Sequence, residues 1–258
     1  MEDYKKFFRY VIPGLVFIIE VSVYLLLSAF DKFSYLIKDN LGNLKDGIGI
    51  AVTAFLLSGG IGYLLAVFYH TLFHIARDKK DWDRKKILKF VRHLLLTVLK
   101  IADHLTLIKD AAEKKKWLKL ENRKNGVVIP VDRLTQAGAW RIATVFLNTR
   151  WASSKRIKSA KQRLESYGDI MHGAGTAFAG SVIAIPVWLC IHYKLSSICP
   201  IGVLLFSILI SIIHLCNYMN IVKDYQGVSN IIIANELQEE WRKNNEQPVT
   251  MHISEDDL

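Results

Sequence analysis

The chain has 258 residues, of which 51% are hydrophobic, and a formal net charge of +10. This composition is more apolar than that of a typical soluble domain and favours a membrane protein. The excess of Lys and Arg suits an anionic partner, either phospholipid head groups or nucleic acid. The three cysteines lack the paired spacing of a thiolate metal or redox centre, so we expect no metal and no cofactor.

Two apolar segments near the N-terminus predict the first pair of membrane-spanning helices. Residues 10–30 contain one ionisable side chain, Glu20, and are long enough to cross a hydrocarbon core of about 30 Å. Residues 47–69 carry no charge. Three small residues lie four apart on one face of this second segment: Ser58, Gly62 and Ala66. Such a face lets backbones approach closely in lipid, so we expect it to pack against the first span or another copy of the chain.

Two further apolar segments, 173–193 and 198–219, are separated by so few residues that they predict an antiparallel helical hairpin. Pro186 lacks a backbone N–H and predicts a kink in the third span. Small residues open that span: Gly173, Gly175 and Ala177. They favour either a hinge or close helix packing, and both interpretations stay open. Cys190 and Cys199 lie near the same helix ends, where either a disulfide or two buried thiols fits.

The charge distribution predicts the orientation. Residues 76–171 hold 24 Lys and Arg against 10 Asp and Glu, a net of +14, and basic flanks face the cytosol. We therefore expect an all-α protein of the cell inner (plasma) membrane with both termini cytosolic. Its predicted regions are a first transmembrane hairpin at 1–75, a basic, mainly helical cytosolic domain at 76–171, a second hairpin at 172–220 and a cytosolic tail at 221–258.

The tail carries three basic and eight acidic residues. It is expected either to contact the basic domain or to be solvated and partly disordered, particularly over 244–258.

Within the basic domain, apolar residues over 87–108 recur at alternating steps of four and three and predict an amphipathic helix. The β-branched run 127–129 follows an Asn125-Gly126 turn and predicts a strand or an extended linker. Asp132 is expected to cap the next helix. The domain's basic surface is expected to bind anionic lipid, with nucleic acid as the alternative. Its members are Lys79, Lys80, Arg84, Lys85, Lys86, Lys114, Lys115, Lys116, Lys155, Arg156, Lys158 and Lys161.

Glu20 is the most informative single residue, because a carboxylate inside a membrane span is costly unless it is protonated, paired or hydrated. We expect it to point into the helix bundle. Its candidate partners are Thr53, Ser58, Tyr63 and His214. The residue is interpreted either as a pore-lining or proton-sensing group or as a neutral acid that links two helices. No phosphate-binding loop, nucleophile elbow or zinc-binding helix occurs, so we do not expect an enzyme.

The layout of four spans around a basic cytosolic region resembles small four-helix membrane effectors of prokaryotic anti-phage defence systems. This resemblance covers the architecture and carries no functional residues across. It implies a homo-oligomer that perturbs or permeabilises the membrane when its cytosolic domain senses a signal, a protein or nucleic acid. The alternatives are a non-conducting scaffold that tethers a complex to the membrane and a small channel or transporter. For a membrane effector, the expected partners are further copies of the same chain and lipid head groups.

Overall fold

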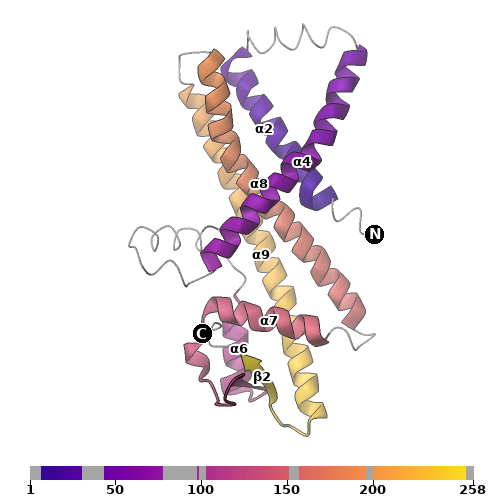
Figure 1. The fold of residues 1–258 in the computed structure, drawn as a ribbon, viewed down its shortest axis with the longest axis vertical. Coiled ribbons are helices and arrows are strands. Elements are labelled where there is room, and N and C mark those ends of the chain that lie inside the picture. Colours follow the sequence, from indigo (N-terminus) through magenta and orange to yellow (C-terminus); the bar gives the residue numbers. More distant parts are fainter. Residues whose placement is uncertain are drawn as a thin grey trace. The chain divides into compact units, whose positions relative to one another are not determined.

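The computed structural model of the chain describes residues 7–30, 44–77, 98, 103–150, 157–195 and 200–253. It is mostly helical, and four helices are long and apolar enough to cross a membrane (Figure 1). This confirms the predicted helical class and the four apolar helices. The elements in chain order are η1 (Phe7–Val11), α2 (Ile12–Ser28), α4 (Leu44–Arg77), α6 (Leu105–Lys109), η2 (Asp110–Lys114), β1 (Leu118–Asn122), η3 (Val131–Arg133), α7 (Gln136–Arg150), α8 (Ile157–Leu195), α9 (Ile201–Lys243) and β2 (Val249–Ile253).

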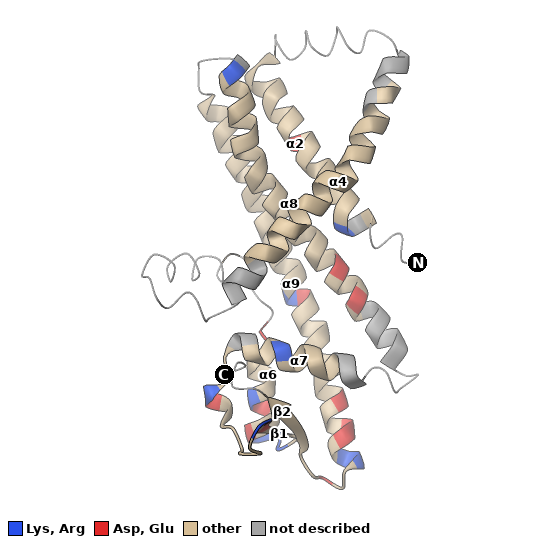
Figure 2. Cartoon of the chain, in the orientation of Figure 1, with Lys and Arg blue, Asp and Glu red and all other residues tan. Residues whose placement is uncertain are grey.

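The chain divides into two compact units. The first unit comprises Met1–Ala76, Lys85–Leu99 and Gly168–Ile221, and the second comprises Arg77–Arg84, Lys100–Tyr167 and Val222–Leu258. Helices α8 and α9 contribute residues to both units. Charged side chains are concentrated on the described elements of the second unit and are sparse on α2 and α4 (Figure 2).

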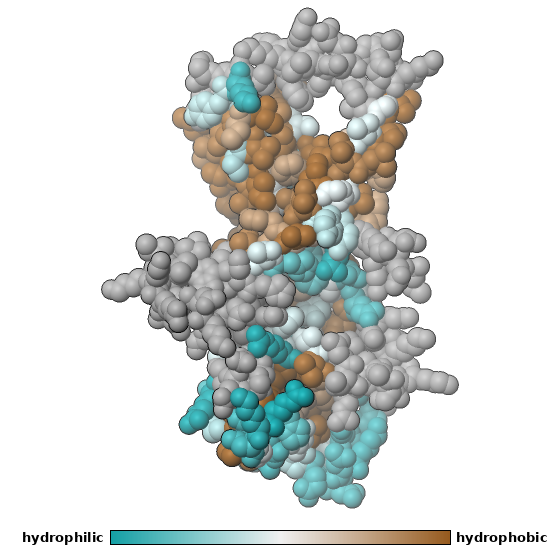
Figure 3. Space-filling model, viewed as in Figure 1, coloured by the Kyte–Doolittle hydropathy of each residue, from teal (hydrophilic) through white to brown (hydrophobic). Residues whose placement is uncertain are grey.

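The first unit is built from the apolar helices. Pro13 lies in the first turn of α2, directly after η1. Pro186 lies inside α8, which is one continuous helix. A core cluster joins α2 to α8 through Tyr24, Leu25, Ala184 and Trp188. Hydrophobic side chains also cover much of the outer surface of these helices, as a surrounding lipid phase would require (Figure 3).

Small residues allow the N-terminal segment to cross α4 at backbone contact. A Cβ atom added to Gly14 would collide with the carbonyl oxygen of Ser58, and one added to Gly62 would collide with that of Tyr10. The structure thus places Ser58 and Gly62 of the predicted small-residue face at this crossing, with Ala66 buried further along the same helix. In a lipid phase, such close backbone approach maximises van der Waals contact.

The small residues of the third span also pack closely. A Cβ atom on Gly175 would lie 2.5 Å from the ring of Tyr69, and one on Gly180 would lie 3.0 Å from Leu65. Gly173 and Ala177 are buried in the same helix, α8. This geometry favours close packing over a hinge at Gly175, because the ring of Tyr69 fills the space that the missing side chain leaves.

The second unit has its own hydrophobic core. That core draws on α6, η2, both strands, α7, and the parts of α8 and α9 that belong to this unit. Strands β1 and β2 pair in parallel, from Leu118 opposite Val249 to Asn122 opposite Ile253. Alternate residues of β1 are buried, as expected for a strand with one face on a core.

One sequence-based expectation for this unit, the cap at Asp132, was wrong, whereas the run 127–129 follows the extended-linker alternative. The main strand precedes the Asn125-Gly126 turn, at 118–122, and the run 127–129 contributes a single antiparallel bridge from Val128 to Glu121. Helix α7 begins after Thr135, whose Oγ1 accepts the N–H of Gly138, so Asp132 is not its cap. Asp132 lies instead in the short helix η3.

For the tail at 221–258, the structure favours the expected contact with the preceding region over a solvated tail. Helix α9 continues to Lys243 and β2 spans Val249–Ile253, so the described part of 244–258 includes a strand. Val222–Leu258 and Lys100–Tyr167 form one unit. The tail packs against this region because its buried residues Val249 and Ile253 complete the core of that unit.

Several expectations concern residues outside the described ranges. These are the apolar seam from Ile87 to Ala102, except Val98, together with Lys79, Lys80, Arg84, Lys85, Lys86, Lys155, Arg156 and Cys199. Lys158 and Lys161 lie in α8, but their side chains are also outside the described part of the structure.

His104 links the start of α6 to α9 within the second unit. Its Nδ1 lies 2.6 Å from Oδ1 of Asn230, and Gln226 donates to the backbone carbonyl of Asp103 at 2.7 Å. Burial lowers the pKa of His104, because the surrounding core disfavours the imidazolium. The folded unit therefore stabilises the neutral form of this histidine.

Replacing Gly62 and Gly60 by alanine should have opposite effects. Gly62→Ala forces the crossing apart and should destabilise the bundle by about 1–3 kcal/mol. Gly60→Ala meets no atom within 4 Å and should stabilise α4 by up to about 1 kcal/mol, because alanine has the higher helix propensity. Thermal unfolding of the detergent-purified chain measures both, and equal shifts would contradict the close crossing.

The second unit should lose stability in mild acid through His104. In the unfolded chain this side chain binds a proton below a pH of about 6.5, whereas the folded state resists protonation. Its contribution is therefore complete above that pH and declines as the pH falls, by at most about 1.4 kcal/mol per pH unit. Melting temperatures between pH 8 and pH 5 should fall more steeply for the wild type than for His104→Gln. Identical slopes of melting temperature against pH in the two proteins would show that His104 does not cause the loss of stability in acid.

Candidate polar site among the apolar helices

Glu20 is the only Asp, Glu, Lys or Arg in α2, and it is buried with 8% of its surface exposed. The neighbouring side chains of α2 are almost all apolar, as in a helix suited to an apolar environment. A carboxyl group at such a position needs hydrogen-bond partners or a proton, since its charged form is poorly solvated there.

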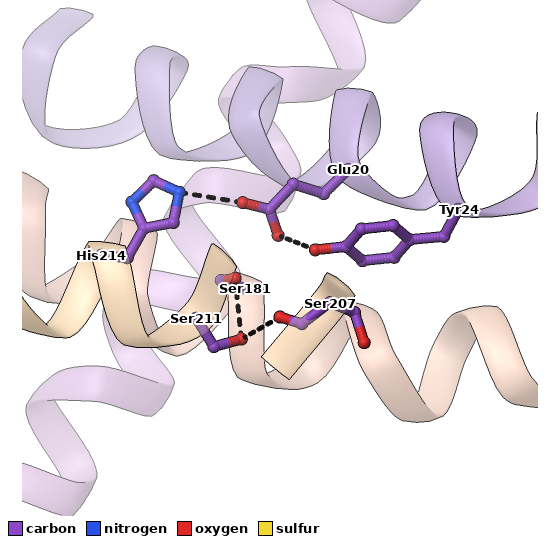
Figure 4. A network of polar contacts seen from close by, with 6 residues as sticks. All are labelled: Glu20, Tyr24, Ser181, Ser207, Ser211 and His214. Carbon is purple, nitrogen blue, oxygen red and sulfur yellow. Dashed lines mark hydrogen bonds and ion pairs between the residues drawn. The ribbon is translucent and has the colours of Figure 1, made fainter. Parts of the chain in front are cut away.

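Both carboxyl oxygens of Glu20 have a partner within the first unit. Nε2 of His214, from α9, lies 2.9 Å from Oε1, and the hydroxyl of Tyr24 donates to Oε2 at 3.3 Å (Figure 4). Tyr24 follows Glu20 by four residues and therefore lies on the same face of α2. The pair exists either as carboxylate and imidazolium or as two neutral groups, depending on which of them holds the shared proton.

A layer of serine hydroxyls lies beside this pair. Ser181 of α8 and Ser211 of α9 are hydrogen-bonded at 3.0 Å. Ser211 also donates to the carbonyl oxygen of Ser207 at 3.1 Å, as Figure 4 shows. All three serines are buried, so their hydrogen bonds replace those that water would make.

Helix α9 supplies most of these groups from a single face. The face carries Ser207, Ser211, His214 and Tyr218, spaced by four, three and four residues, and we call it the polar stripe. At 1.5 Å per residue the stripe extends for about 16 Å, roughly half of a hydrocarbon core.

Further buried polar contacts continue from the stripe along the other helices of the first unit. At the end nearer Tyr218, its hydroxyl lies 3.0 Å from that of Tyr69 in α4. Nearer the C-terminal ends of α2 and α8, Nε1 of Trp188 donates to the hydroxyl of Ser28 at 2.9 Å. The apolar bundle thus contains polar groups at several successive levels, and several of them have a partner on another helix.

Of the four candidate partners for Glu20, the structure brings His214 to it. Thr53 and Tyr63 are exposed on α4, and Ser58 donates to the carbonyl oxygen of Phe55 within its own helix. Sequence reasoning missed Tyr24 and the serines of α8 and α9. The available signals were the four-residue spacing from Glu20 to Tyr24 and the four-three-four spacing of the polar stripe.

The described lysines of the expected basic surface lie on the second unit. Lys114 forms an ion pair with Asp110 at 2.8 Å, and the ammonium group of Lys115 lies 5.8 Å from the centre of the Trp117 ring. Lys116 is exposed, with a positive φ of 57°. The hydrogen bond from Lys114 to Asp110 raises the pKa of that lysine, so its charge is engaged locally.

Within the described ranges, no three His, Cys, Asp or Glu side chains gather into a group that could hold a metal ion. Cys190 and Cys216 are free thiols on exposed positions of α8 and α9.

Glu20 and His214 should be energetically coupled. Glu20→Leu leaves His214 and Tyr24 without their buried partner and should destabilise the bundle by about 1–3 kcal/mol. Combining it with His214→Leu should cost less than the sum of the single changes, by about 0.5–3 kcal/mol. A double-mutant cycle on thermal unfolding in detergent measures this coupling, and strict additivity would show that the two side chains do not interact.

Comparisons with models of protein families, with curated proteins and with solved structures found no match to this chain. The described residues combine a paired carboxyl and imidazole among apolar helices, a polar stripe that extends from them, and a second unit with its own core.

Proposed function

We propose that this chain is a membrane effector that acts as a homo-oligomer and permeabilises the inner membrane to protons or small cations. Its second unit would act as the cytosolic sensor of a signal, a protein or a nucleic acid. The Glu20–His214 pair is the observation that carries this proposal, because a paired carboxyl and imidazole are expensive to maintain among apolar helices. Groups of this kind mark ion pathways and proton relays in membrane proteins.

The chemistry of the pair fits proton or cation movement. A proton can reside on the carboxyl oxygen or on Nε2, which are 2.9 Å apart, so either protonation state is hydrogen-bonded. If the helices separate, water reaches Glu20 and stabilises its charged form, which then favours cations. The polar stripe supplies hydroxyl groups on the same side of α9, where water molecules would find partners.

The oligomer is supported by the exposure of α4. Only 22% of the most apolar window of this helix is buried within the chain, the remainder being available to lipid or to another copy. Its open side includes Gly49, where an added Cβ atom would meet no other atom within 4 Å. Small residues on a lipid-exposed face allow close approach of a second helix.

The sensor role rests on the construction of the second unit. This unit has its own core and is connected to the first through the continuous helices α8 and α9. A partner that binds the second unit can therefore bias the helices of the first one mechanically. The exposed Lys115 and Lys116 make an anionic partner the natural choice.

Glu20→Gln should abolish most of the cation or proton flux. The amide keeps the hydrogen bonds but cannot be charged, so the loss of about 1.5–3 kcal/mol of charge-assisted stabilisation predicts a decrease of roughly ten- to a hundredfold. Purified chain in proteoliposomes, with a pH-sensitive dye and an imposed potassium gradient, measures the flux. Tyr63→Phe is the matched control, because it removes a hydroxyl from an exposed position of α4 and should leave the flux unchanged.

Two outcomes would contradict the effector. One is flux that survives both Glu20→Gln and Glu20→Leu. The other is wild-type proteoliposomes that stay tight while nucleic acid or a defined protein copurifies with the chain, which would favour the scaffold instead. Dissipation of the membrane potential on induced expression in cells should follow the same order of variants as the reconstituted flux.

A further inference from the structure

A second group of ionisable side chains lies in the first unit, where three apolar helices begin or end. Arg9 is the first residue of its apolar span, and His70 lies two residues before the last one of the second span. Asp169 and His172 are near the start of the third. We call these four residues the helix-end cluster. In a bilayer, residues at the ends of apolar spans lie at the level of the lipid head groups.

The contacts of the cluster centre on Arg9 and His70. Nη2 of Arg9 lies 3.0 Å from Nε2 of His70, while Nη1 lies 3.8 Å from a carboxylate oxygen of Asp169, too far for a hydrogen bond. The rings of His70 and His172 are 4.7 Å apart between centroids, with an angle of 48° between their planes. His70 therefore touches both other nitrogen-bearing side chains.

Two nitrogen atoms of this cluster lack a partner. Among the buried side-chain atoms of the described residues, Nε of Arg9 and Nδ1 of His172 make no hydrogen bond. A buried N–H group without an acceptor costs about 1–3 kcal/mol. The Nε–H of Arg9 is such a donor, and Nδ1 of His172 is a second one in the tautomer that carries the proton on that nitrogen, so an acceptor belongs in the cluster.

We propose that the helix-end cluster binds a phosphate group, with Arg9 Nε and His172 Nδ1 as donors. Phosphate oxygens match a guanidinium group in both charge and geometry. Neutral carboxamide and hydroxyl ligands do not match it in charge. A cation is disfavoured beside Arg9. Phosphate can come from a lipid head group or from the cytosol, and the position at the ends of the apolar helices favours the anionic phosphodiester of a phospholipid. This site does not depend on the proposed permeation.

Titration of the full chain in neutral, lipid-free detergent tests the site. Short-chain phosphatidylglycerol, phosphatidylcholine and inorganic phosphate are added separately, and the melting temperature is followed. Phosphatidylglycerol should raise it in a saturable manner and more than phosphatidylcholine does. A shift with inorganic phosphate alone would assign the site to a soluble phosphate, whereas no saturable shift with any of the three would overturn the proposal.

Variants of the cluster should move the affinity in opposite directions. Arg9→Lys keeps the charge but removes Nε, and His172→Phe keeps a ring against His70 but removes Nδ1. Each should weaken binding of phosphatidylglycerol about tenfold, the effect of losing one charge-assisted hydrogen bond. Asp169→Asn removes a negative charge next to the ligand and should tighten binding. Lys194→Gln, at the other end of α8, is the control and should bind as the wild type does.

The ligand-free proteins separate this role from a structural one. His172→Phe removes a buried unpaired nitrogen, so its melting temperature without lipid should equal or exceed that of the wild type. Equal lipid-induced shifts in the wild type, Arg9→Lys and His172→Phe would overturn the phosphate site and leave a bridging water molecule as the partner of both atoms.

Discussion

The exclusion of water from the apolar helices is the constraint on which the arrangement of the first unit depends. A polar group buried in such a bundle needs a hydrogen-bond partner within the protein, because its bonds to solvent are lost on burial. Apolar contacts alone would let helices slide or rotate with little change in energy, since one aliphatic surface resembles another. The Glu20–His214 pair removes that freedom, because only one register of α2 against α9 joins these two side chains. The contacts of Tyr69 with Tyr218 and of Trp188 with Ser28 restrict α4 and α8 in the same way.

Much of the first unit could be predicted from its sequence, and the reason is physical. Long runs of apolar residues have few alternatives to a helix in a medium that cannot hydrogen-bond the backbone. Glu20 was recognisable because a single carboxyl group among apolar residues is exceptional. The sequence could not show which of the four candidates, among them His214, would pair with Glu20. That pairing depends on how α9 is rotated about its axis. Small hydroxyl residues such as Ser181 and Ser211 escaped notice because they are common in apolar helices and carry no charge.

Prediction was weaker in the second unit, where the signals are local and compete. The strand at Leu118–Asn122 lies in a lysine-rich stretch, and its burial pattern arises only when β2 lies beside it. The β-branched run after the turn had the higher strand propensity but makes a single bridge, because tertiary pairing outweighs propensity. The acidic composition of the tail suggested solvation, yet its buried residues Val249 and Ile253 belong to the core. Contacts between residues so distant along the chain are not visible in any short window of sequence.

The pairing of β1 with β2 has a consequence for how the protein is made. Strand β1 is synthesised before α8 and α9, whereas β2 follows both of them. The ribosome therefore has to deliver the entire second pair of apolar helices before the sheet can close. Until then, β1 presents an unpaired edge, the kind of surface that recruits chaperones or aggregates. A nascent chain that stalls between these elements would have both apolar helices complete and the sheet still open, so completion of the second unit is coupled to the synthesis of α8 and α9 by the order of translation.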